Sequence, residues 1–208
     1  YDNLLSNVYS DKNLGVTFDN VMRFHNHLSN VIKIAYSALR PLYSNYNIIN
    51  YKLRKKLCES LVLPILNYGL VVFYPCLDRV SQLRLQRIQN CCCRYIFRLR
   101  KYDHISAKLK ELNWLNMANL YKLNMAVLVH KILSTSSPPY LRDKFIFRHN
   151  IHEVNLRHVN RLSVPRHRTT LFQHSFLYNA VKIYNELDDG LKSGPVSKLK
   201  CMLKRTLT

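Results

Sequence analysis

The chain has 208 residues, of which 48% are hydrophobic and 21% charged, so it can build a core for one domain or two small ones and is not a disordered chain. Its 32 Lys and Arg against 12 Asp and Glu give a net charge of +20, more than solubility requires, and predict a polyanionic partner. Residues 52–110 hold thirteen bases and three acids, whereas residues 1–51 hold four and three. Nucleic acid is therefore the first candidate partner.

The six cysteines form no C-x-x-C pair, which argues against both a zinc ribbon and a disulfide framework and favours a reducing compartment. No signal peptide opens the sequence, which begins without Met inside what reads as a running pattern. We therefore expect a fragment of a longer intracellular protein, located in the nucleus and cytoplasm and not secreted.

The first expected element is a β-hairpin in the segment from Leu4 to Phe18, with its turn at residues 10–13. Gly15 in the expected second strand indicates that another backbone or a ligand comes close. From Val21 the apolar residues change to helical spacing, and Pro41 marks the expected end of this long helix.

A second helix is expected from Tyr51, with a basic run followed by an apolar stretch that Pro64 should kink or divide. Residues 60–77 are eighteen residues without a charge, which reaches the length of a membrane span. Two prolines interrupt the stretch, so we interpret it as a core element and expect no membrane partner. A basic protein of the membrane surface stays open as an alternative that rests on this stretch alone.

The segment from Arg79 to Lys101 reads as a helix with two faces. One arc of about 100° gathers apolar residues and is expected to face a core: Leu85, Ile88, Cys92, Tyr95, Ile96 and Leu99. A neighbouring arc gathers cations: Arg84, Arg87, Arg94, Arg98 and Lys101. Together with Lys52, Arg54, Lys55 and Lys56 of the preceding helix, these are the expected nucleic-acid contacts, since phosphates attract cationic side chains.

Further helices are expected at residues 104–112, 116–133, 170–187 and 196–207, separated by a break at residues 134–139 and an extended loop that reaches residue 168. The predicted fold is mainly α: a helical, thumb-like bundle with a short N-terminal β-hairpin and a second C-terminal helical region. The expected regions are 1–19, 20–110 and 111–208, with a loop at about 134–168 in the last.

No catalytic or metal-binding residues are predicted. Asp188 and Asp189 lack the third carboxylate that a two-metal polymerase site needs, and they follow a helix rather than a strand. The histidines between residues 149 and 174 have no standard zinc spacing. Aspartates and histidines in such patterns more commonly lie on a polar surface.

Several short motifs in order resemble the region after the polymerase palm in non-LTR (LINE-type, jockey-like) retrotransposon reverse transcriptases. The N-terminal motifs are Leu14-Gly15-Val16-Thr17-Phe18-Asp19, Pro64-Ile65-Leu66-Asn67-Tyr68-Gly69 and Leu85-Gln86-Arg87-Ile88-Gln89-Asn90. The C-terminal motifs are Ser137-Pro138-Pro139-Tyr140-Leu141, Pro165-Arg166-His167-Arg168, Tyr184-Asn185-Glu186-Leu187 and Lys198-Leu199-Lys200. The family's Trp-Asn-x-Leu-Pro stands here as residues 184–188, and its Phe-Lys as Leu199-Lys200, which points to a divergent copy.

The resemblance implies that Leu14, Gly15 and Val16 belong to a primer grip and that residues 20–110 form a thumb. The thumb would hold the RNA or DNA template-primer duplex for the rest of the parent polymerase. The palm, with the catalytic aspartates and two Mg²⁺ ions of that family, would lie outside this chain, so no cofactor is expected in it. The alternative from a different class is a stand-alone or degenerate nucleic-acid-binding module without polymerase activity.

Overall fold

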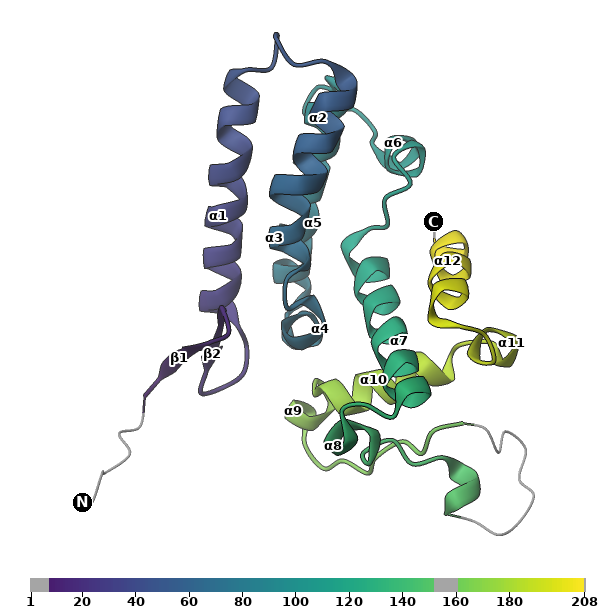
Figure 1. Ribbon diagram of the computed structural model, residues 1–208. Helices are drawn as coiled ribbons and strands as arrows, with labels where there is room; N and C mark the ends of the chain where they lie inside the picture. Colours follow the sequence, from purple (N-terminus) through teal and green to yellow (C-terminus); the bar gives the residue numbers. More distant parts are fainter. Residues whose placement is uncertain (1–7, 152–160, 208) are drawn as a thin grey trace. The chain divides into compact units, whose positions relative to one another are not determined.

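The computed structural model describes residues 8–151 and 161–207, in two compact units, Tyr1–Leu112 and Asn113–Thr208 (Figure 1). Most described residues are helical, and one two-stranded antiparallel sheet lies near the N-terminus. This confirms the predicted mainly α fold with a short N-terminal hairpin.

The hairpin of the first unit pairs β1 (Ser10–Asn13) with β2 (Val16–Asp19), and Asn13 lies opposite Val16. The turn therefore consists of Leu14 and Gly15, both at positive φ (47° and 82°), as a two-residue hairpin turn of type I′ requires. The predicted turn at residues 10–13 is wrong, because those residues form the first strand. The start of the predicted first strand lies outside the described residues.

Helix α1 (His25–Ser44) follows, and the side chain of Asp19 fixes the approach to it. The Asp19 carboxylate accepts hydrogen bonds from the backbone N–H groups of Arg23 (2.8 Å) and Phe24 (2.6 Å). The helix does not end at Pro41 as predicted but continues through it to Ser44. A proline this close to the end removes only one backbone hydrogen bond, while Leu42 beyond it is buried in the core.

The second helical stretch contains four segments: α2 (Tyr51–Leu57), the π-helical turn η1 (Cys58–Val62), α3 (Leu63–Asn67) and α4 (Leu70–Phe73), followed by the 3₁₀ turn η2 (Tyr74–Cys76). The π turn stands directly before Pro64, whose missing N–H disturbs the regular α-helical pattern. By length and composition, the 26 residues Tyr51–Cys76 are enough to cross a membrane, a test that core helices also pass. Val62, Leu66 and Phe73 of this stretch are buried.

Helix α5 (Arg79–Phe97) packs against α1 and α2, and α6 (Ser106–Glu111) follows it. Figure 1 shows α1, α3 and α5 running side by side in the first unit. Five of the six predicted core residues of the 79–101 segment are fully buried, and Leu99, which is half-buried, lies beyond the end of the helix. The core of the first unit thus lies between these long helices.

The second unit is built on α7 (Met117–Thr135), against which α10 (Phe176–Asn185) and α12 (Val196–Leu207) pack. Buried His130 of α7 bonds the Tyr184 hydroxyl through Nδ1 (3.2 Å) and the Gly194 carbonyl through Nε2 (2.8 Å). One histidine thereby fastens α10 and the start of α12 to the central helix.

Three short helices complete the second unit: α8 (Pro139–Arg142), α9 (Thr170–Gln173) and α11 (Asp189–Lys192). The predicted single helix over residues 170–187 is divided, because Ser175 begins a new helix by accepting the N–H of Tyr178 (3.4 Å). The predicted loop contains the 3₁₀ turn η3 (Arg148–Asn150) and a bridge between Phe147 and Leu162. Residues 152–160 of that loop lie outside the described residues.

Candidate nucleic-acid interface

Helix α2 supplies the first group of predicted contacts. Its N-terminus is fixed by Asn50, whose side chain accepts the N–H of Leu53 (2.9 Å). Lys52 and Lys56 are exposed and, being four residues apart, lie on the same side of the helix. Lys55 is half-buried, with its ammonium 3.9 Å from the carboxylate of Glu59. Two of the four predicted cations of α2 are therefore free to meet a ligand in solution.

Arg54, the fourth predicted contact on α2, is only 6% exposed. Its guanidinium carbon lies 5.5 Å from the centre of the Tyr46 ring, in the turn between α1 and α2. Arg54 is thus buried, whereas Lys52 and Lys56 on the same helix are exposed. The sequence predicted Arg54 as an exposed contact because basic residues are rarely buried.

Helix α5 supplies the second group. Asp78 begins it by accepting the N–H of Ser81 (3.0 Å). Hydrogen bonding from Ser81, first from its side chain and then from its backbone N–H, lowers the pKa of the Asp78 carboxyl from its usual value. Arg84 and Arg87 are exposed, and Arg94 is half-buried. Residues 79–101 include no acid, so no carboxylate on this segment competes for these cations.

Arg98 and Lys101 lie beyond the end of α5, because Arg98 adopts a left-handed conformation (φ 57°) that terminates the helix at Phe97. The predicted helix over residues 79–101 is therefore four residues too long. Arg98 is exposed, donates a hydrogen bond from Nη2 to the carbonyl of Tyr46 (3.3 Å) and lies over the Tyr46 ring at 4.9 Å. The exposed Lys101 lies over the ring of its neighbour Tyr102 at 5.5 Å.

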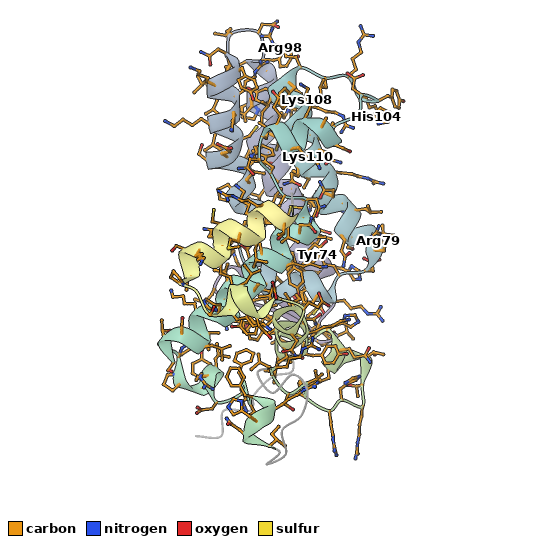
Figure 2. The ribbon with its side chains drawn as sticks, turned by 90° about the vertical axis from the view of Figure 1, so that its right-hand side faces the viewer. Tyr74, Arg79, Arg98, His104, Lys108 and Lys110 are labelled. Atoms are coloured by element: carbon orange, nitrogen blue, oxygen red, sulfur yellow. The ribbon has the colours of Figure 1, made fainter. Side chains whose placement is uncertain are left out.

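Additional cations near α5 were not predicted as contacts. Figure 2 shows Arg98 with Lys108 and Lys110 near one end of the first unit, and Arg79 farther along it. Lys108 is held by the Glu111 carboxylate (2.7 Å) and the Phe97 ring (4.7 Å), whereas Lys110 is exposed. The sequence signal for Arg79, Lys108 and Lys110 is the excess of basic over acidic residues in the range 52–110.

Helix α5 is about 28 Å long, which matches the rise of about eight base pairs of a duplex.

The three residues of the predicted primer grip lie at the hairpin turn. Leu14 is 86% exposed, Gly15 follows it in the turn, and Val16 is buried. The Tyr68 hydroxyl donates a hydrogen bond to the Leu14 carbonyl, and a Cβ at Gly15 would lie 3.3 Å from the Tyr68 ring. The close approach predicted at Gly15 is thus made by a side chain from another part of the chain.

Gly69 makes a second contact with the hairpin, at Val16. It has φ 65°, and a Cβ there would lie 3.0 Å from a methyl group of Val16. The structure therefore brings together two sequence motifs that are more than fifty residues apart: the hairpin turn and the segment containing Tyr68 and Gly69. A hydrogen bond and two glycine contacts fix the hairpin to the helical bundle.

A cavity of about 350 Å³ lies beside the hairpin, between β1, β2 and α1, and Lys12, Gly15, His27 and Lys33 are among its lining residues. Nδ1 of His27 accepts the N–H of Thr17 (3.3 Å), and burial lowers the pKa of this histidine from its usual value. His27 is therefore a neutral link between β2 and α1.

The carboxylates and histidines that were weighed and not predicted as sites lie in the second unit, and His152 and His158 are outside the described residues. Asp189 is exposed and pairs with Lys192 at 2.8 Å, and Asp188 precedes α11. Within residues 8–151 and 161–207, no group of three or more His, Cys, Asp or Glu is placed to hold a metal ion. The six cysteines are thiols rather than disulfides, and Cys58, Cys92 and Cys93 are buried.

The chain matches no protein-family model, no curated protein and no solved structure.

Proposed function

We propose that the first unit grips a nucleic-acid duplex through the exposed cations of α2 and α5. The observation that carries this proposal is the run from Arg79 to Lys101, in which one helix buries its apolar face and exposes arginines with no acid among them. A duplex carries one phosphate charge for about every 1.7 Å of its axis, so a straight basic helix can neutralise several phosphates at once.

In this proposal the chain is the primer-grip, thumb and C-terminal region of a non-LTR retrotransposon reverse transcriptase. The support is the order of the sequence motifs, together with the contact between the Leu14–Gly15 turn and Tyr68. The thumb would position the template-primer for an RNA-directed DNA polymerase, because phosphoryl transfer depends mainly on placement and charge stabilisation. The aspartates and two Mg²⁺ ions would belong to the palm of the parent polymerase, inside the cell.

The second candidate is a nucleic-acid-binding module that works without a polymerase. The observation in its favour is that α2, α5 and the hairpin belong to one compact unit, which carries the exposed cations of the proposed surface. The two candidates share the same surface and differ in whether a polymerase uses it. Binding by the chain alone tests what they share, and primer extension by a polymerase containing it distinguishes them.

The test is a fluorescence-anisotropy titration of a labelled RNA–DNA duplex with the 208-residue chain. The double variant Arg84→Glu and Arg87→Glu should weaken binding at least about tenfold, since each reversal replaces an attraction to phosphate by a repulsion. The control is Lys33→Glu with Arg40→Glu, which reverses two exposed cations on α1. Equal losses in the two double variants would leave only a general charge effect and contradict the assignment to α5.

A further inference from the structure

Two arginines and two tyrosines meet where the α1–α2 turn approaches the C-terminal end of α5. This Arg–Tyr cluster consists of Tyr46, Arg54, Tyr95 and Arg98. The guanidinium carbons of Arg54 and Arg98 lie over one ring, that of Tyr46, at 5.5 and 4.9 Å from its centre. The rings of Tyr46 and Tyr95 are 6.1 Å apart. The cluster therefore concentrates positive charge around two aromatic rings.

The Arg–Tyr cluster contains buried polar atoms that lack hydrogen-bond partners. Arg54 is 6% exposed, and among the described residues neither its Nε nor its Nη1 finds a hydrogen-bond acceptor. Within the described part of the chain the hydroxyl of Tyr95, which is fully buried, also has no partner. No described carboxylate forms an ion pair with Arg54 or Arg98. The cluster thus holds buried donors and no described counter-charge.

Such an arrangement is unfavourable by itself. Burying an unpaired charge costs more free energy than one contact between a cation and an aromatic ring returns. Buried polar groups in proteins are nearly always hydrogen-bonded, and an exception calls for an explanation such as an unseen ion. An anion at the cluster would supply both the acceptors and the charge.

We propose that the Arg–Tyr cluster is a binding site for a phosphate group. Two guanidinium groups without a carboxylate match the charge of phosphate, and the guanidinium fork matches its oxygens better than any other side chain does. The exposed Arg98 lies over the same ring as the buried Arg54, so it can hold the outer side of the group. The phosphate could come from a nucleic-acid strand, which rests on the proposed function, or from a free phosphorylated molecule.

The test compares the thermal unfolding of the 208-residue chain in sodium phosphate and in sodium chloride of equal ionic strength. Phosphate should raise the Tm of the wild-type chain, because a ligand that binds the folded state stabilises it. Arg54→Met keeps most of the side-chain length but removes the charge. This variant should lose the rise in Tm, because its affinity for phosphate should be at least about tenfold weaker. Arg40→Met, at an exposed site on α1, is the control and should keep the gain.

The same measurement separates a ligand site from a structural role. In chloride, Arg54→Met should unfold at the same or a higher temperature than wild type, because it removes a buried charge that lacks a partner. An equal phosphate effect in wild type and Arg54→Met, or none in wild type, would overturn the proposal. If Arg54→Met does not fold, Arg98→Gln decides: a reduced phosphate gain supports the site, and an unchanged gain refutes it.

Oligonucleotide arms then identify the source of the phosphate. If a strand supplies it, Arg54→Met should also weaken binding of the RNA–DNA duplex. If a free phosphorylated molecule is the ligand, phosphate should raise the Tm of the wild-type chain, and Arg54→Met should bind the duplex with the wild-type affinity. If the α5 double variant loses duplex binding but keeps the phosphate effect, the phosphate site is supported independently of α5. If the wild-type chain does not bind the duplex at all, the proposed function is contradicted and the phosphate site is not.

Discussion

Neutralising Arg84 and Arg87 should reduce the salt dependence of duplex binding by about a third. Six of the predicted contacts are exposed: Lys52 and Lys56 on α2, Arg84 and Arg87 on α5, and Arg98 and Lys101 just beyond it. If each neutralises one phosphate, the logarithm of affinity falls against the logarithm of salt with a slope of about −5.4. Raising salt from about 50 to about 200 mM then weakens binding roughly 1,800-fold, and the double variant Arg84→Gln with Arg87→Gln should show a slope of about −3.6 and a roughly 150-fold loss.

The assay is anisotropy of a labelled RNA–DNA duplex at five salt concentrations, with Lys33→Gln and Arg40→Gln as the charge-matched control. The control should keep the wild-type slope, because both of its residues lie on α1 and outside the proposed surface. A wild-type slope near zero would refute phosphate binding. A control slope that falls as much as that of the α5 variant would refute the choice of residues.

Two further predictions concern the folded state of each variant. Gly69→Ala should lower the free energy of unfolding by about 1 to 3 kcal/mol, since φ is 65° there and the new Cβ would lie 3.0 Å from Val16. Urea denaturation measures this loss. The control Gly190→Ala should cost far less, because a Cβ there would meet nothing within 4 Å. Burial lowers the pKa of His27, so below about pH 6.5 the unfolded chain takes up a proton at this histidine more readily than the folded chain does. The free energy of unfolding should therefore fall as pH drops below about 6.5, by at most about 1.4 kcal/mol per pH unit. His27→Gln should remove that part of the pH dependence of the urea midpoint, and a profile identical to wild type would contradict the assignment.

The strongly periodic parts of the chain could be predicted from the sequence. The stripe from Leu85 to Ile96 is buried as its spacing indicates, and the last helix runs from Val196 to Leu207 as expected. Periodicity works for these helices because each has one apolar side that must face a core. The excess of cations in residues 52–110 could likewise be counted without a structure.

Contacts between distant residues decided the rest. The hairpin turn formed at Leu14 and Gly15 rather than at the polar residues before them, because both adopt positive φ and Tyr68 packs against the turn. Pro41 stayed inside its helix because Leu42 beyond it is buried, and burial outweighs one lost hydrogen bond.

The basic residues show this division most clearly. The sequence by itself determined that the chain is cationic and that α5 has one packing face and one charged face. Only the tertiary structure separated Arg54 from its neighbouring lysines, burying it over the Tyr46 ring beside Arg98. The physical reason is that net charge is a sum over residues, whereas burial depends on which side chains meet across the fold.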